Sequence, residues 1–200
     1  MSAPGPSYRR HRRYTALVTH RNIARVRGVV LLLSVLFVSG IAAQVPAPRT
    51  PDIHFAATPQ PLADAMLQLA KITRDDVVYD LGSGDGRIVV LAAQKYGARG
   101  VGIDIDPQRI AEANENAKAA GVTGKVKFLV QDLFTSDVSE ATVVTLYLLP
   151  SVNEKLLPKL QKELKPGTRI VSHAFSFGDA WPSERKEVVD GKTIYFWTIK

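Results

Sequence analysis

Hydrophobic residues along the chain follow two alternating patterns after residue 57. Short runs rich in Val, Ile and Leu predict buried strands, and segments with apolar residues every three or four positions predict amphipathic helices. We expect strands at 76–81, 100–104, 126–130, 142–146 and 169–173. We expect helices at 58–70, 86–96, 106–120 and 151–164.

The end of the chain departs from this alternation. Two runs, 186–189 and 193–199, flank Asp190-Gly191, a pair typical of a tight hairpin turn. Strands that alternate with helices form a mostly parallel sheet with right-handed crossovers, and a terminal hairpin makes one late strand antiparallel. The prediction is an α/β fold with a Rossmann-like sheet of seven strands and helices on both faces.

Two of the helices have recognisable starts. Asp106 followed by Pro107 suits an N-cap and the first helical position. Ser151 and Glu154 have the spacing of a capping box, so the fourth helix is predicted to begin at Ser151.

An uncharged apolar run at 28–43 follows an Arg-rich segment. The run is shorter than the roughly 20 residues of a comfortable membrane span, and it ends in small residues typical of a cleavage site, at 40–43 before Gln44. We expect 1–43 to be a signal peptide or a membrane anchor, 44–57 a Pro-rich linker, and 58–200 the folded domain. By the positive-inside rule the arginines stay cytoplasmic and the domain emerges on the far side of the membrane.

The net charge of +7 belongs to the N-terminal segment. Residues 1–50 contain eight arginines and no acid, which leaves 18 basic and 19 acidic residues in the rest of the chain. The folded domain therefore has no basic footprint, and we expect no nucleic-acid partner. The chain has no cysteine, which excludes disulfides and thiolate nucleophiles, and its four histidines lack metal-ligand spacing.

The first predicted strand runs directly into a glycine-rich stretch, DLGSGDG at 80–86. Glycine permits positive φ and a close approach of a ligand, and the helix that follows offers free N–H groups. Acids also end the first three strands, at Asp80, Asp104 and Asp132. Because the carboxyl ends of parallel strands share one edge, these acids suit a nucleoside: Asp104 binds the ribose hydroxyls and Asp132 an adenine amino group.

Glycine spacing separates the candidate cofactors. A dinucleotide loop needs G-x-G-x-x-G, and its third glycine position is Arg87 in this chain. Asp80 would repel a pyrophosphate but suits the cationic amino-acid end of S-adenosylmethionine. An NAD(P)-linked oxidoreductase is disfavoured for these reasons and because no Tyr-x-x-x-Lys pair is present.

The three motifs DLGSGDG (80–86), GIDID (102–106) and QDLF (131–134) together resemble the class I, seven-strand S-adenosylmethionine-dependent methyltransferases. More narrowly, TPQP (58–61) and LYLLP (146–150) are similar to bacterial relatives of the mitochondrial methyltransferases that modify lysine in the ATP synthase c-subunit. The resemblance implies methyl transfer by in-line displacement to an amine acceptor, a protein lysine or a small molecule. A looser likeness to the nucleosomal histone lysine methyltransferases of the seven-strand type lies in IVSHAF (170–175) and the preceding helix, but those enzymes carry an Asn-rich motif where this chain has Leu148-Leu149-Pro150.

These motifs and strand ends give the candidate site. Cofactor contacts are expected at Thr58, Asp80, Gly82, Ser83, Gly84, Gly86, Asp104, Ile105, Asp132 and Leu133. The acceptor pocket is expected at Tyr147, as a hydrogen-bond or cation–π wall, and at His173, which accepts a proton or a hydrogen bond. A packed tyrosine and a structural histidine are the competing interpretations. Phe175, Phe177 and Trp181 either line the acceptor channel or pack in the core.

Two alternatives to a protein-lysine methyltransferase remain open from the sequence. One is a methyltransferase that acts on a small molecule. The other is a binding module without turnover, which would share the fold, although every cofactor-facing acid and glycine is present. A monomer is expected.

The expected export conflicts with the cofactor, because S-adenosylmethionine is made in the cytosol. Three explanations are open: the donor reaches the outer compartment, the N-terminal segment has the opposite orientation, or translation starts downstream of Met1.

Overall fold

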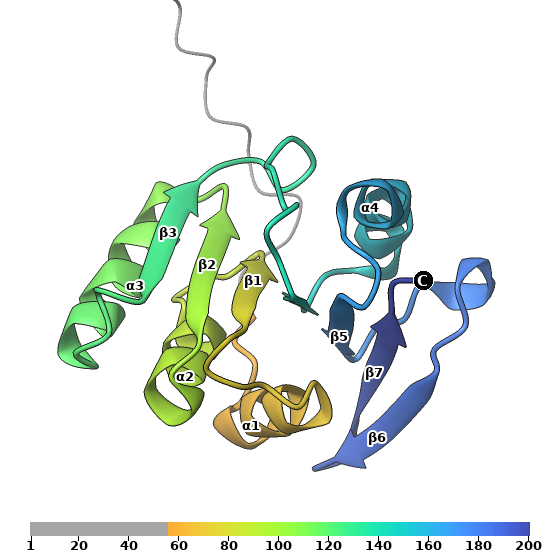
Figure 1. The fold of residues 1–200 in the computed structure, drawn as a ribbon, viewed down its shortest axis with the longest axis horizontal. Helices are drawn as coiled ribbons and strands as arrows, with labels where there is room; N and C mark the ends of the chain where they lie inside the picture. Colours follow the sequence, from red (N-terminus) through yellow and green to blue (C-terminus); the bar gives the residue numbers. More distant parts are fainter. Residues whose placement is uncertain (1–55) are drawn as a thin grey trace, which may run out of the picture. The chain divides into compact units, whose positions relative to one another are not determined.

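The computed structural model of the protein describes residues 56–200. Seven strands form one sheet in the order β3-β2-β1-β4-β5-β7-β6 (Figure 1). The strands are β1 (Val77–Leu81), β2 (Arg99–Asp104), β3 (Val126–Val130), β4 (Val143–Leu146), β5 (Arg169–His173), β6 (Arg185–Val189) and β7 (Lys192–Thr198). The helices are α1 (Gln60–Leu69), α2 (Arg87–Tyr96), α3 (Pro107–Ala119) and α4 (Pro150–Glu163), with a 3-10 turn η1 at Gly178–Ala180.

Strands β1 to β5 run parallel, and β7 lies antiparallel between β5 and β6. The fold prediction is confirmed, including the single antiparallel strand made by the terminal hairpin. Strand order reverses between β1 and β4, so their carboxyl ends form the switch point where such sheets bind ligands. Asp80 in β1 lies opposite Gly102 in β2 and Thr145 in β4 at this edge.

Helices cover both faces of the sheet unevenly. Helices α1, α2 and α3 pack on one face, where Met66 and Ile88 are buried against Val78. Helix α4 packs on the other face, where Leu156 and Leu160 belong to a second buried cluster with strand residues of β1, β4, β5 and β7. The link from β3 to β4 contains no helix, so this second face depends on α4 and on the loops around it.

Helix α4 begins one residue earlier than the capping box predicted. Leu149 is the extended N-cap (ψ 153°) and Pro150 the first helical residue, and no side chain caps this end. Proline suits the first helical position because its φ is preset and its missing N–H needs no partner, while the residue before it is driven into extended backbone. The capping-box prediction at Ser151 is therefore wrong. At α3 the prediction is confirmed, since Asp106 Oδ1 accepts a hydrogen bond from Gln108 N at 2.8 Å.

The predictions for the N-terminus concern mainly residues that the structure does not describe. The segment 1–43 and all but the last two residues of the linker 44–57 lie outside the described residues. From residue 56 onward, no helix has the length and apolarity required to span a membrane.

Candidate functional site

The glycine loop between β1 and α2 is pinned to the end of β2. The backbone N–H groups of Gly82 and Ser83 both donate to the carbonyl of Ile103, at 2.8 and 2.9 Å. Gly82, Gly84 and Gly86 have φ of +83°, +51° and +75°. Side chains other than glycine rarely adopt these values, so the backbone of the loop requires the alternating glycines that the sequence shows.

Two of these glycines also leave room for neighbouring side chains. A Cβ on Gly86 would lie 2.6 Å from the ring of Phe128 and 2.8 Å from the Ala113 methyl, and one on Gly82 would lie 2.9 Å from Leu148. The sequence analysis attributed the glycines to a ligand that approaches the backbone. The structure adds a second cause, because Gly86 sets how closely the loop packs on β3 and α3.

Asp104 at the end of β2 fastens the loop through its carboxylate. Its Oδ2 accepts from Gly84 N at 2.8 Å and its Oδ1 from Asp106 N at 3.0 Å. Each oxygen keeps a further lone pair, so the predicted hydrogen bonds to ribose hydroxyls remain open to it. Asp132 after β3 accepts a hydrogen bond from Phe134 N at 2.9 Å. The half-buried Ile105 and Leu133 each follow one of these acids at the same edge.

Asp80 is a buried carboxyl at the base of the loop. Thr145 Oγ1 donates a hydrogen bond to its Oδ1 at 2.7 Å. Burial raises the pKa of Asp80 to about 7, the Thr145 hydrogen bond opposes that rise, and the negative charges of Asp104 and Asp85 add to it. A cation at this place would stabilise the carboxylate, which fits the ammonium group of an amino-acid tail.

The two residues predicted for the acceptor pocket are in direct contact. The rings of Tyr147 and His173 stack with centroids 3.8 Å apart, and Thr58 Oγ1 lies 3.2 Å from His173 Nδ1. Burial, together with the positive charge of Lys192, lowers the pKa of His173 to about 4. The imidazole is therefore neutral near pH 7. The structure thus brings Tyr147 and His173, both predicted for the acceptor pocket, into contact, and it places Thr58, predicted at the cofactor, beside His173.

A tight turn after β5 places an aromatic ring beside this pair. Ala174 has φ of +64°, and Phe175 N donates to the carbonyl of His173 at 2.8 Å. The Phe175 carbonyl accepts from Ser172 Oγ at 2.6 Å and from Asn153 Nδ2 at 3.3 Å. With its backbone fixed in this way, the Phe175 ring lies 6.3 Å from that of Tyr147, between centroids.

Of the other predicted channel residues, Phe177 lies in the core and the half-buried Trp181 packs against it. Phe177 is fully buried, and its ring packs edge-on against Trp197 with centroids 4.8 Å apart. Trp181 lies 5.5 Å from Phe177, and its carbonyl accepts a hydrogen bond from Trp197 Nε1 at 2.9 Å. Of the two interpretations of Phe177 and Trp181, packing is the one that their contacts support.

Polar atoms without partners gather at the carboxyl edge of the sheet. Within residues 56–200, Ser83 Oγ, Asn153 Oδ1 and His173 Nε2 are buried without a hydrogen-bond partner, and the fourth such atom is Tyr96 Oη at the end of α2. Each buried unpaired polar group costs about 1–3 kcal/mol. Three such atoms on elements that end at one edge indicate a polar ligand there, and a nucleoside with an amino-acid tail has the donors and acceptors to fit.

Sequence reasoning missed three residues at this edge. Arg87 and Asp85 form an ion pair beside the loop, with Nη2 and Oδ2 2.6 Å apart. Asn153, fully buried in the first turns of α4, donates a hydrogen bond from Nδ2 to the Phe175 carbonyl in the turn after β5. A signal for Arg87 existed, because it replaces the third glycine of the dinucleotide pattern, whereas Asn153 looks like any polar residue near a helix start.

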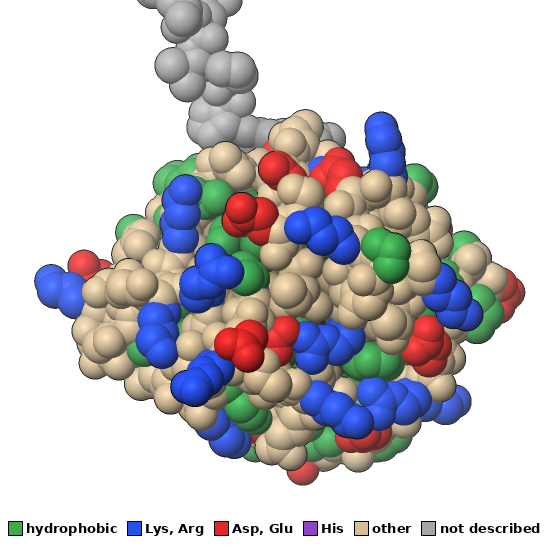
Figure 2. Space-filling model, viewed as in Figure 1, with side chains coloured by type: hydrophobic (Ala, Val, Ile, Leu, Met, Phe, Trp, Pro, Cys, Tyr) green, Lys and Arg blue, Asp and Glu red, His purple; other side chains and the backbone are tan. Residues whose placement is uncertain are grey.

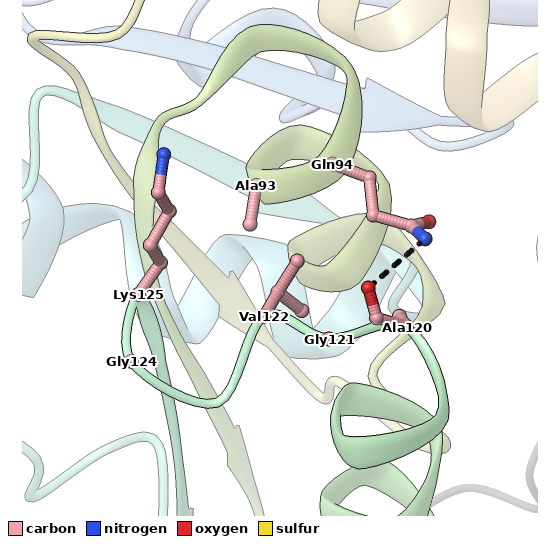
Figure 3. A pocket seen from close by; sticks show the side chains of 7 residues that line it. All are labelled: Ala93, Gln94, Ala120, Gly121, Val122, Gly124 and Lys125. Atoms are coloured by element: carbon pink, nitrogen blue, oxygen red, sulfur yellow. Dashed lines mark hydrogen bonds between the residues drawn. The ribbon is translucent and has the colours of Figure 1, made fainter.

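A pocket on the opposite edge of the sheet is separate from this site. In Figure 3, residues from the ends of α2 and α3 and from the loop before β3 line it. Gln94 Nε2 donates to the carbonyl of Ala120 at 3.4 Å, and Lys125 Nζ donates to that of Gly97 at 3.1 Å. These segments lead into the amino ends of β2 and β3, so none of the predicted site residues lines this pocket.

Comparisons with known proteins agree on one family. A sequence model of the ANTKMT methyltransferase domain matches residues 80–184. A protein-lysine N-methyltransferase of Saccharolobus islandicus is 46% identical over 153 residues, which cover 74% of this chain and 95% of the relative. The lysine N-methyltransferase of Mus musculus that acts on the ATP synthase c-subunit is 32% identical over 66% of this chain, and the chain spans about half (53%) of its length.

A solved structure shares the fold and carries a cofactor product. It is an RNA methyltransferase from Salinibacter ruber in complex with S-adenosyl-L-homocysteine. The two chains are 57% identical with a TM-score of 0.71, and the match covers 72% of this chain and 94% of the other. S-adenosylhomocysteine is what remains of S-adenosylmethionine after its methyl group has been transferred.

Proposed function

The chain is an S-adenosylmethionine-dependent methyltransferase of the ANTKMT methyltransferase domain family, and on that basis we propose that its methyl acceptor is the side-chain amine of a protein lysine. The observation that carries the proposal is the stack of Tyr147 on His173, with Phe175 beside it, at the edge that carries the glycine loop. Aromatic faces bind the alkyl chain of lysine and attract its cationic or partly methylated head. The Saccharolobus islandicus relative, named a protein-lysine N-methyltransferase, supports the same acceptor.

Residues of this chain would bind the donor at the glycine loop. Asp104 and Asp132 would hold the nucleoside end, and Asp80 would face the amino-acid end together with the buried hydroxyl of Ser83. Thr58 would close over that end. When bound there, S-adenosylmethionine would supply a methyl group on a sulfonium; the N–C bond to the acceptor would form as the S–C bond breaks, and the electron pair would stay on sulfur.

The lysine must lose a proton before it attacks, and the basicity of His173 decides where that proton goes. The pKa of His173 is lowered to about 4 by burial, whereas a free lysine has a pKa of about 10.4. Moving a proton between groups about six units apart costs about 8 kcal/mol. The proton therefore leaves to solvent, and neutral His173 accepts a hydrogen bond and orients the amine.

Charge also distinguishes protein from RNA as the acceptor. The Salinibacter ruber structure is described as an RNA methyltransferase. Residues 51–200 of this chain carry 18 basic and 19 acidic residues, and on the face in Figure 2 basic and acidic side chains are interspersed. An RNA-binding surface would need a basic track along the site. A protein acceptor is favoured, with a small-molecule amine as the runner-up.

A labelled-methyl experiment tests this proposal. The full chain is incubated with methyl-tritiated S-adenosylmethionine and extracts of the cells that produce it. We expect label in material that protease degrades and nuclease does not, released as methyllysine by acid hydrolysis. Asp104→Ala should reduce incorporation at least about tenfold, because it removes charge-assisted hydrogen bonds. Label in nuclease-sensitive material, or only in small molecules, would overturn the lysine proposal.

A further inference from the structure

Arg87 joins the glycine loop to the segment before α1. Its Nε and Nη2 donate to the two carboxylate oxygens of Asp85 at 2.9 and 2.6 Å, and its Nη1 donates to the carbonyl of Thr58 at 3.1 Å. Three donors of one guanidinium are thus used together. Only arginine has donors in this fixed fork, because the lysine ammonium is a single point charge on a flexible stem.

The position of Arg87 is unfavourable for α2 itself. It is the first residue of the helix, and the first turn contains no acidic residue. A cation near a helix N-terminus opposes the macrodipole and destabilises the helix. A residue that breaks a local rule in this way, beside a functional loop, indicates a role in the site.

Thr58 extends this contact to the acceptor end. The residue is buried, its carbonyl accepts from Arg87, and its hydroxyl lies 3.2 Å from His173 Nδ1. Thr58 is the hydrogen-bond partner that the structure shows for the His173 ring, because Nε2 has none within residues 56–200. A hydroxyl can donate or accept, so Thr58 can hold the imidazole ring through Nδ1 in either tautomer.

We propose that Arg87 is a positioning residue for methyl transfer, which fixes the Thr58 carbonyl and thereby the hydrogen bond between the Thr58 hydroxyl and His173. The contacts run from Asp85 through Arg87 and Thr58 to His173, which stacks on Tyr147. The cofactor loop and the acceptor end are thereby connected through one threonine. This inference rests on the lysine methyl transfer proposed above, in which neutral His173 orients the amine.

A double-mutant cycle between Arg87→Lys and Thr58→Val tests the connection in the full chain. Each substitution should lower kcat/KM for the acceptor by about three- to tenfold, the size of one lost hydrogen bond. If both act through the same contact, the double variant loses little more than the single ones. A loss equal to the product of the two single losses would overturn the proposal. Arg74→Lys is the matched control, since Arg74 is exposed at the other edge of the sheet.

Nitrogen-15 NMR of the imidazole gives a readout that needs no acceptor. The His173 signals are assigned by their disappearance in His173→Asn. We expect Thr58→Val and Arg87→Lys to move both ring-nitrogen signals of His173 in the same direction, and Thr58→Ser and Arg74→Lys to leave them in place. Asp85→Asn, which removes the anionic partner of the guanidinium, should move them by a smaller amount and serves if Arg87→Lys fails to fold. Unchanged His173 signals in a folded Arg87→Lys protein would refute the proposal even if the methyl acceptor proves not to be lysine.

Discussion

Asp80 is the residue whose ionisation should depend most on the cofactor. Burial raises the pKa of its carboxyl in the free protein to about 7, and the ammonium of the bound cofactor would lower that pKa again. Binding therefore favours the deprotonated form, and below about pH 7 each complex that forms must release a proton. Affinity for S-adenosylmethionine should fall about tenfold for each pH unit below 7, where the α-amino group of an amino acid stays protonated.

Calorimetry of the full chain between about pH 5.5 and 7, in buffers of different ionisation enthalpy, measures this proton release. Asp80→Asn should remove the pH dependence, and an unchanged slope in that variant would contradict the assignment.

The folding stability of the free chain should depend on pH in the opposite direction to its affinity for the cofactor. The stabilisation from protonated Asp80 is complete below the unfolded pKa of 3.8 and is lost as pH rises through about 7, so the free chain should be less stable at neutral pH than Asp80→Asn.

The low basicity of His173 leads to a prediction for the pH dependence of kcat/KM, because His173 is too weak a base to take the proton of lysine. If the proton leaves to solvent, kcat/KM should rise about tenfold per pH unit between pH 7 and 9, toward the lysine pKa of about 10.4. His173→Asn should keep that slope and lower the whole profile, as expected for loss of an orienting hydrogen bond. Initial rates with a lysine-containing acceptor across this pH range test whether the proton leaves to solvent. A profile that levels off near pH 7 in the wild-type chain would point to a general base instead.

Among the structural elements, the glycine loop allows a controlled test of packing against backbone strain. Gly86 and Gly121 have similar positive φ, +75° and +69°, but a Cβ would meet Phe128 and Ala113 at Gly86 and nothing within 4 Å at Gly121. Gly121→Ala should cost about 1 kcal/mol from the backbone alone. Gly86→Ala should cost about 1–3 kcal/mol more because the core must also shift. Urea unfolding of both variants measures the difference, and equal losses would show that packing at Gly86 is unimportant.

The elements also show what sequence can predict. Strand and helix positions followed from hydrophobic period, and the hairpin from Asp190-Gly191, because both signals are local. The start of α4 was misjudged because Pro150, one residue ahead of Ser151, already satisfies the helix start without a side-chain cap. The contact from Arg87 to Thr58 joins residues 29 apart in the chain, and that from Thr58 to His173 joins residues 115 apart. No local pattern predicts which partners such side chains meet.

At the scale of the whole domain, the two edges of the sheet differ in how their buried polar groups are satisfied. At the amino edge, Asp76 accepts hydrogen bonds from Thr73, Thr142 and Arg169, and among residues 56–200 Tyr96 Oη is the one buried polar atom there without a partner. At the carboxyl edge, Ser83, Asn153 and His173 each keep an unpaired polar atom. Composition could not show this asymmetry, whereas strand order and register make it visible. Cofactor binding is therefore expected to stabilise the domain mainly by giving hydrogen-bond partners to the unpaired atoms at the carboxyl edge.

The orientation of the whole chain across a membrane is the remaining prediction from its N-terminus. Residues 1–27 are rich in arginine and precede the uncharged run 28–43, so we propose that the domain is exported or anchored on the outer side. With an epitope after Lys200, protease added to spheroplasts should remove the epitope, and a cytosolic marker should survive. Replacing Arg21, Arg25 and Arg27 with glutamate weakens the orientation signal and should increase the protected fraction. Protection of the wild-type epitope in intact spheroplasts would place the domain with the cytosolic methyl donor, and the N-terminal arginines would then need another explanation.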